Sequence, residues 1–167
     1  MKQREGEENM VIEKVRDYFE QRNMADRILE FDASSATVAL AAEALHCEPC
    51  RIAKTLSFKV NEEPVLIVAA GDARVDNHKY KMQFGVKAKM LGYEEVEPLV
   101  GHAPGGVCPF AVNEGVKVYL DDSLKRFETI FPACGSANSA IELTIPELEE
   151  TSGSLGWVDV CKDWNRE

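Results

Sequence analysis

The sequence predicts an α+β fold, in which a single compact domain has helices flanking a mixed or antiparallel β-sheet. Its 167 residues suffice for one domain with a substantial core. Apolar residues make up 45% and charged residues 29% of the chain, an ordinary balance for a globular protein. Helical and strand patterns follow one another without a strict strand–helix–strand rhythm, so the sheet is not expected to be purely parallel.

The first third of the chain predicts two helices. In MVIEKVRDYFE, apolar residues recur at every fourth position, as on one face of an amphipathic helix, which we expect over Met10–Arg22. SSATVALAAEAL predicts a second helix, capped by Ser34 or Ser35 and ending near His46–Pro49.

The remainder of the chain predicts the sheet and two further helices. RIAKTLSFKV and PVLIVAAG, separated by NEE, predict two strands and a turn, and the second strand is expected to be central because both its faces are apolar. VDNHKYKMQFG predicts a short helix capped by Asp76 or Asn77 and stopped at Gly85. The T-x-x-E capping box in TIPE predicts a last helix around Pro146–Glu150. EEVEPLVGHAPGGVCPF is expected to lead into a loop rich in Gly and Pro, and further strands are expected in VKVYLDD, FETIFPACG, SAIELT and WVDVC.

Charge and hydropathy limit the partners and the compartment. The net charge is −10, which argues against nonspecific DNA binding because phosphates require a positive surface. No signal peptide is visible, and the longest apolar run is too short to span a bilayer, so we expect a cytoplasmic protein without a membrane or DNA partner. Residues 1–9 are polar and are expected to be frayed or disordered, which leaves 10–167 as the folded domain.

One dense basic segment stands out in this acidic chain. It is either a solvated face or a patch that contacts tRNA phosphates. Its members are Arg74, Lys79, Lys81, Lys87 and Lys89.

The C-x-x-C of CEPC favours neither redox nor metal chemistry. A redox pair lies at the N-terminus of a helix, where the helix dipole lowers the thiol pKa, whereas Cys47 and Cys50 are predicted to follow a helix and precede a strand. A structural zinc site needs a second pair of ligands, which is absent. We therefore expect reduced thiols, no metal and no cofactor.

Lys54 is the first candidate for a functional residue. Strand alternation places it on one face with Ile52, Leu56 and Phe58. Either its stem lies over a sheet edge with the ammonium in water, or the ammonium points into a cleft where it meets an anion or a carbonyl.

Two loops are further candidates. In GHAPGGVCPF, Gly105 and Gly106 allow close backbone approach and Pro109 stiffens the exit, so free N–H groups there could hold a developing oxyanion; a plain surface turn fits the pattern as well. In YLDDSL, Asp121 and Asp122 lie at a strand end, a frequent place for functional carboxylates, although Asp-Ser is also ordinary turn chemistry.

Taken in order, RIAKTLSF, VLIVAAGDARVD, GHAPGGVCPF, VYLDDSL and ACGSANSAIELT resemble the YbaK/EbsC family of aminoacyl-tRNA deacylases. The same domain occurs as the editing insertion of bacterial prolyl-tRNA synthetases. The resemblance runs from about residue 30 to the end of the chain. It implies a barrel-like sheet and a hydrolase for translation fidelity that acts in trans on mischarged tRNA, with a small amino acid on a tRNA of the proline type. It also implies that the partners are the acceptor end of the aminoacyl-tRNA and, as a further candidate, a synthetase.

The resemblance also implies a set of site residues. The lysine of KTL corresponds to Lys54 and the G-x-x-x-P loop to Gly105–Pro109. The strand-end aspartate aligns with Asp121, although alternation places Asp122 on the face of Val118 and Leu120. The remaining expected pocket residues, with a structural role as the alternative for His102, are His102, Val107, Cys108, Gly135 and Ser136.

The implied mechanism is attack of water on the aminoacyl ester, without a protein nucleophile or a metal. Loop N–H groups would hold the carbonyl oxygen, Lys54 would orient the ester or the terminal phosphate, and the terminal ribose hydroxyl would help to activate the water. The alternative is a noncatalytic tRNA- or synthetase-binding module of the same fold. The sequence does not distinguish which amino acid or tRNA is used.

Overall fold

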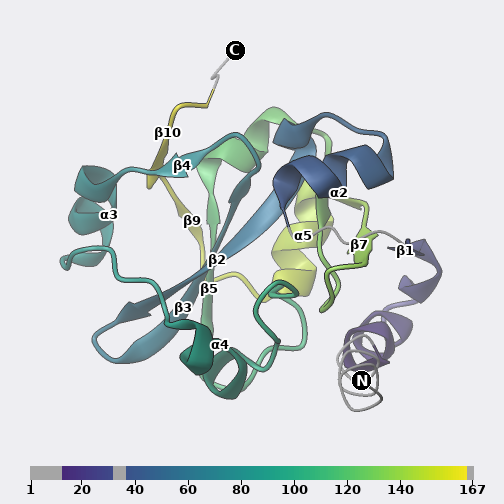
Figure 1. Cartoon of the computed structure of the whole chain (residues 1–167), viewed down its shortest axis with the longest axis horizontal. Coiled ribbons are helices and arrows are strands. Elements are labelled where there is room, and N and C mark those ends of the chain that lie inside the picture. Colours follow the sequence, from purple (N-terminus) through teal and green to yellow (C-terminus); the bar gives the residue numbers. More distant parts are fainter. Residues whose placement is uncertain (1–12, 32–36, 165–167) are drawn as a thin grey trace.

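A six-stranded mixed sheet, with the strand order β8-β6-β2-β3-β5-β9, runs through the centre of the computed structural model (Figure 1). The structure describes residues 13–31 and 37–164. The strands of this sheet are β2 (Ile52–Val60), β3 (Glu63–Ala70), β5 (Lys117–Asp121), β6 (Thr129–Pro132), β8 (Leu143–Thr144) and β9 (Trp157–Val158). Parallel and antiparallel pairs both occur, and the sheet curls into a half-barrel, which confirms the predicted α+β class.

Two small sheets complete the β-structure. The strand β1 (Ile28–Glu30) pairs with β7 (Ser139–Ile141), and β4 (Arg74–Val75) pairs with β10 (Cys161–Lys162). The single strand predicted in WVDVC is thus two short strands, of which β9 extends the main sheet and β10 leaves it to pair with β4. The strand β1 was not among the predicted elements.

The hairpin of β2 and β3 forms as predicted. Its register runs from the pair Ala53–Ala70 to the pair Val60–Glu63. Asn61 and Glu62 connect the strands and both have positive φ angles, 50° and 69°, as a two-residue hairpin turn requires. Residues 65–70 of β3 are buried between β2 and β5, which confirms the prediction of a central strand.

Helices cover the sheet at both ends. In Figure 1, α3 lies to the left of the sheet and α2 to its right. Asp76 caps α3 by accepting from Lys79 N at 3.0 Å, and Gly85 ends this helix, as predicted. Thr144 and Glu147 form the predicted capping box of α5. The helices are α2 (Val38–Leu45), α3 (Asn77–Phe84), α4 (Tyr93–Val100), α5 (Ile145–Ser152) and an unlabelled helix over residues 13–20.

Two predictions about helices need correction. The cap of α2 is Thr37, whose hydroxyl accepts from Leu40 N at 3.2 Å, instead of the predicted Ser34 or Ser35. Both serines lie outside the described residues, and so do residues 1–9, for which a frayed end was predicted. The segment before the Gly/Pro-rich loop is the helix α4. This helix was not predicted, because it begins after a glycine and contains Pro98. The capping box, in which Gly92 N–H donates to Glu95 Oε1 at 3.1 Å, supports α4 instead.

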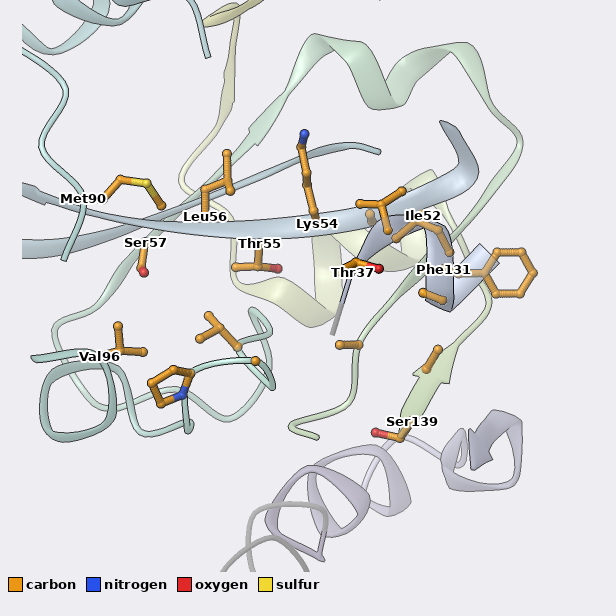
Figure 2. Close-up of a pocket in the computed structure, with 18 of the residues that line it drawn as sticks. Thr37, Ile52, Lys54, Thr55, Leu56, Ser57, Met90, Val96, Phe131 and Ser139 are labelled. Atoms are coloured by element: carbon orange, nitrogen blue, oxygen red, sulfur yellow. The ribbon is translucent and has the colours of Figure 1, made fainter. Parts of the chain in front are cut away.

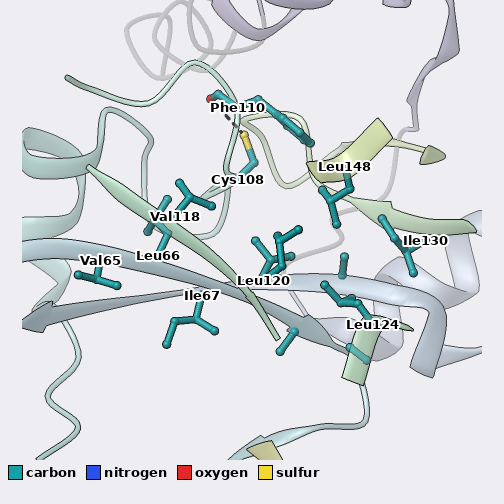
Figure 3. Close-up of a cluster of buried hydrophobic side chains, with 14 of the residues drawn as sticks. Val65, Leu66, Ile67, Cys108, Phe110, Val118, Leu120, Leu124, Ile130 and Leu148 are labelled. Carbon is teal, nitrogen blue, oxygen red and sulfur yellow. Dashed lines mark hydrogen bonds between the residues drawn. The ribbon is translucent and has the colours of Figure 1, made fainter. Parts of the chain in front are cut away.

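The core lies on both faces of β3 and β5. Figure 3 shows Leu66, Val118 and Leu120 packed among side chains from the loop before β5 and from α5. Val15 and Phe19 of the N-terminal helix are fully buried against this core, in agreement with the predicted amphipathic face. No helix within the described ranges has the length and apolarity that a membrane span requires.

Candidate functional site

A cavity of about 530 Å³ opens beside β2, a size typical of small-molecule sites. Five segments contribute to its wall: residues 37–45, 52–57, 90–96, 104–107 and 131–140. Most lining side chains are apolar, and the polar ones are hydroxyls and a single lysine. No carboxylate or imidazole occurs among the lining residues that the structure describes.

The cavity exists because one edge of β2 is only partly paired. At one end, β6 pairs with Ile52 and Ala53. Further along, Leu91 N donates to Ser57 O at 3.0 Å and Lys59 N donates to Lys89 O at 2.8 Å. Among the described residues, no strand neighbours the edge between these two contacts.

Thr55 lies in the middle of this open edge. In a strand, alternate residues direct their backbone polar groups to the same edge. Since Ser57 O and Lys59 N point to the edge, the N–H and C=O of Thr55 do so as well. The hydroxyl Oγ1 of Thr55 is also buried and has no hydrogen-bond partner among the described residues. A buried polar atom without a partner is costly, so this cluster of unpaired groups is suited to a polar ligand.

Figure 2 shows how the side chains of β2 divide between two sides. Thr55 and Ser57 point toward the side of the cavity where Val96 and Ser139 lie. Lys54 and Leu56 point to the opposite side of the strand. Thr55, Ser57 and Ser139 were not singled out from the sequence, because small hydroxyl side chains on strands carry no distinguishing pattern.

Lys54 lines the cavity, but its ammonium points away from the side on which Thr55 and Ser57 lie. Nζ donates to the carbonyl oxygen of Ala73. Burial lowers the pKa of Lys54, and the charge of Asp72 acts in the opposite direction. The sequence allowed an ammonium in water or an ammonium that meets an anion or a carbonyl in a cleft. In the structure the ammonium is half-buried and bound to a carbonyl oxygen.

The Gly105–Gly106 loop forms the opposite wall. Gly105 lines the cavity with a φ of +90°, a conformation that favours glycine. Gly106 packs against the turn before β7, where a Cβ atom would lie 2.7 Å from Gly135 O. Gly106 N donates to Ala103 O at 3.0 Å, whereas the N–H groups of Gly105 and Val107 have no acceptor within residues 13–31 and 37–164.

Three other predicted residues of this loop face the core instead of the cavity. His102, Cys108 and Pro109 are buried and are not part of the cavity wall. His102 Nε2–H donates to Phe110 O at 2.7 Å, so Nδ1 is an unprotonated acceptor, and it has no partner among the described residues. Burial lowers the pKa of His102 to about 4 and raises that of Cys108 to about 12. Figure 3 shows the Cys108 sulfur directed toward Phe110, with a dashed line to the carbonyl oxygen of that residue. These residues hold the loop in place, which supports the structural alternative for His102.

The two aspartates at the end of β5 lie outside the cavity wall. Asp121 is fully buried, and its carboxylate accepts from Ser123 N and Val160 N, both at 2.9 Å. Asp122 begins the 3₁₀ helix η3 (Asp122–Arg126) and pairs with Lys125 at 3.1 Å. Strand alternation placed Asp122 on the face of Val118 and Leu120. This prediction is wrong, because β5 ends at Asp121 and Asp122 already belongs to η3.

The turn before β7 reaches the cavity through a hydroxyl pair. Gly135 has a φ of 87° and supports the close approach of Gly106. Ser136 is buried, and its Oγ lies 2.8 Å from Ser139 Oγ. Because Ser139 lines the cavity, the structure brings the ACGS turn and the glycine loop together at one wall.

Comparison with known proteins agrees with this arrangement. The sequence profile of the aminoacyl-tRNA editing domain matches residues 32–151, more than half of the chain. The chain belongs to the aminoacyl-tRNA editing domain family. This editing domain is 54% identical over 156 residues to the uncharacterized protein YwhH of Bacillus subtilis, which covers 93% of the chain and 99% of that protein.

Two more distant similarities involve proteins connected with proline. The editing domain is 33% identical over 95 residues to the proline–tRNA ligase of Bacillus cytotoxicus, covering 56% of the chain but only 16% of the ligase. It also superposes on the crystal structure of a candidate trans-editing enzyme for prolyl-tRNA synthetase, with a TM-score of 0.82 and 28% identity over 91% of the chain and 97% of that structure.

Arg74, Lys79 and Lys81, which were predicted to contact phosphates, are not part of the cavity wall of the editing domain. Arg74 and Lys81 are exposed. Lys79 is engaged within the fold, since Nζ contacts Asp159 Oδ1 at 3.1 Å and Cys161 O at 3.0 Å.

The thiols of the C-x-x-C are free and partly buried. Burial raises the pKa values of both Cys47 and Cys50, opposite to what a reactive redox thiol needs. No group of three or more potential metal ligands occurs among the described residues of the editing domain.

Proposed function

We propose that this editing domain is a trans-acting deacylase, which hydrolyses the ester between a small, noncognate amino acid and the 3′ end of a tRNA of the proline type. The observation that carries the proposal is the open β2 edge facing the glycine loop across one cavity. Within residues 13–31 and 37–164, the edge offers acceptors without a partner, suited to an α-ammonium, and the loop offers N–H donors without a partner, suited to a carbonyl oxygen. Family membership and the similarity to a proline–tRNA ligase support the same substrate class.

In the proposed reaction, water attacks the ester carbonyl carbon. The carbonyl oxygen, which becomes negatively charged in the tetrahedral intermediate, accepts from the N–H groups of Gly105 and Val107. The intermediate then collapses with cleavage of the bond to the ribose oxygen, which takes up a proton as the amino acid leaves. Because the described wall carries no carboxylate or imidazole, the neighbouring ribose hydroxyl is the proposed proton relay. It accepts a proton from the attacking water and donates its own proton to the ribose oxygen that leaves.

The ammonium of the amino acid would be held at the β2 edge. Thr55 C=O and Oγ1 are the proposed acceptors, and hydrogen bonds to a charged group are stronger than those to a neutral one. Lys54 would exchange Ala73 O for an oxygen of the ester or of the terminal phosphate. Asp121 would act as a positioning residue, because its carboxylate joins the end of β5 to Val160.

Selection among amino acids would be steric. The cavity wall is mostly apolar and includes Val38, Ala41 and Val107. Such a wall admits small side chains and excludes larger ones, whereas it distinguishes small side chains from one another only weakly.

The test is hydrolysis of a panel of aminoacyl-tRNAs that carry small amino acids, by the wild type, Lys54→Ala and the control Lys117→Ala. We expect turnover of one or two members, loss of turnover in Lys54→Ala, and unchanged turnover in Lys117→Ala, since Lys117 is exposed, outside the cavity wall and outside the basic segment. Absence of turnover on every member, with tRNA binding intact, would instead identify a noncatalytic tRNA- or synthetase-binding module.

A further inference from the structure

Two large apolar side chains are exposed at one side of the cavity mouth. Tyr93, the first residue of α4, is 80% exposed, and Met90 is 55% exposed. Both belong to the cavity wall, yet neither is part of the hydrophobic core. Exposing such side chains contributes nothing to the packing of this domain, whereas an exposed aromatic ring beside a cavity is a suitable contact for a flat ligand.

The segment that leads to these residues is basic. Lys87 and Lys89 are exposed, and neither takes part in an ion pair among the described residues. Glu95, which lies nearby on α4, is already bound to Lys59 Nζ. Glu94 is exposed on the same helix, so the positive charge of this rim is modest. The surface therefore favours a contact through the aromatic face over one through phosphates alone.

The chemistry of the proposed substrate determines what lies at the mouth. An amino acid esterified to a terminal ribose cannot occupy the cavity unless the ribose and its base lie just outside. Among the described residues that line the cavity, Phe131 is the other aromatic one; it is 8% exposed, and the Arg51 guanidinium lies over its ring at 5.1 Å. Tyr93 is thus the aromatic ring that a base at this mouth can reach.

We propose that Tyr93, supported by Met90, forms a stacking platform for the terminal adenine of the tRNA, with Lys89 close to the adjoining phosphates. This inference rests on the proposed function, because it assumes that the cavity receives the aminoacyl end of a tRNA. Stacking of a base on an aromatic side chain is a sequence-tolerant contact and a common means of binding unpaired nucleotides.

The experiment measures equilibrium binding and does not depend on hydrolysis. The probe is a stem–loop RNA ending in CCA, whose terminal adenosine carries alanine through an amide instead of an ester. A second probe has an abasic terminal nucleotide. Both are titrated with the wild type, Tyr93→Ala, Tyr93→Phe and the control Met82→Ala, since Met82 is 76% exposed on α3 and outside the cavity wall.

We expect Tyr93→Ala to weaken binding of the adenosine probe by roughly 5- to 100-fold, the range for loss of one stacked base, and Tyr93→Phe and Met82→Ala to leave it within about twofold. The abasic probe should bind the wild type as weakly as the adenosine probe binds Tyr93→Ala. Removing both the base and the ring should cause no further loss, because both changes remove the same contact.

The inference is overturned if Tyr93→Ala binds the adenosine probe as tightly as the wild type does, or if the wild type binds neither probe. It is also overturned if the loss of affinity caused by Tyr93→Ala and the loss caused by the abasic nucleotide add in full. These outcomes are separate from the hydrolysis assay. Hydrolysis that is insensitive to Tyr93→Ala would leave the deacylase standing without the platform. Tyr93-dependent binding without hydrolysis of any ester would leave the platform standing without the deacylase.

Discussion

The buried imidazole behind the glycine loop makes folding stability depend on pH in a predictable way. His102 is fully buried, donates from Nε2 to Phe110 O, and has an Nδ1 without a partner in the described structure. Burial disfavours the charged imidazolium and lowers the pKa to about 4, from 6.5 in a solvated histidine. Between these two pKa values the unfolded chain binds a proton that the folded chain does not. Stability contributed by His102 is therefore present above pH 6.5 and is lost as the pH falls toward 4.

The size of the effect follows from the two pKa values. A difference of about 2.5 units corresponds to a loss of about 3 kcal/mol once the pH is below both values. Between pH 7.5 and pH 5, where few carboxylates have titrated, the expected loss is about 2 kcal/mol. For the whole domain this is a large fraction of a typical folding free energy.

The perturbation is His102→Gln, which keeps a donor for Phe110 O and removes the titrating group. Urea unfolding is followed by tryptophan fluorescence at several pH values between 7.5 and 5, for the wild type, His102→Gln and the control His78→Gln. The wild type and the His78→Gln control, which replaces an exposed histidine, should lose about 2 kcal/mol more than His102→Gln over this range. Because the carboxylates are the same in all three proteins, their titration cancels in the comparison. Equal pH slopes for the wild type and His102→Gln would refute the reasoning.

Three other substitutions test the site and its support. Thr55→Val removes a hydroxyl that has no partner among the described residues, so the free energy of unfolding should stay level or rise by up to about 1 kcal/mol. The kcat/KM for the ester should fall about tenfold. A parallel fall of stability and activity would contradict this prediction. Gly106→Ala places a methyl group 2.7 Å from Gly135 O and should cost about 1–3 kcal/mol in urea unfolding, and a neutral result would show that the two loops separate freely. Asp121→Asn replaces a carboxylate oxygen that accepts a backbone N–H by a donor and should cost about 1–3 kcal/mol, against less than about 0.5 kcal/mol for Asp122→Asn; similar costs would argue against the buried role of Asp121.

Sequence patterns predicted the elements whose determinants are local. The β2–β3 hairpin follows from alternation around a short turn, and the caps of α3 and α5 involve residues three positions apart. The helix α4 escaped prediction because its signals, a glycine cap and an internal Pro98, are those of a loop.

The candidate site was predicted less completely, because its contacts are long-range. Alternation shows that Lys54 shares a face with apolar neighbours, but not that this face turns away from Thr55 and Ser57 toward Ala73 O. Likewise, Asp121 accepts from Val160 N, 39 residues further along the chain, so a motif around the aspartate cannot reveal its partner. Of the predicted residues in the glycine loop, Gly105 and Val107 line the cavity, whereas Cys108, two residues from Gly106, is a core residue.

The open edge of β2 suggests why this fold is suited to an ester substrate. Proteins usually pair or cover the edges of a sheet, because unpaired backbone groups attract other chains. Here β6 covers one end of the edge and the segment around Leu91 covers the other. Within the described part of the chain, the stretch around Thr55 stays unpaired, and it lines a cavity. A gap of this length is too short to accept another strand but presents a donor and acceptors fixed by the sheet. Backbone groups held in this way need no reorganisation when a polar ligand arrives, and preorganised dipoles are what a reaction with a developing oxyanion requires. In the proposed function, the same gap would bind an ammonium whatever the side chain of the amino acid, which would leave selection among amino acids to the apolar wall.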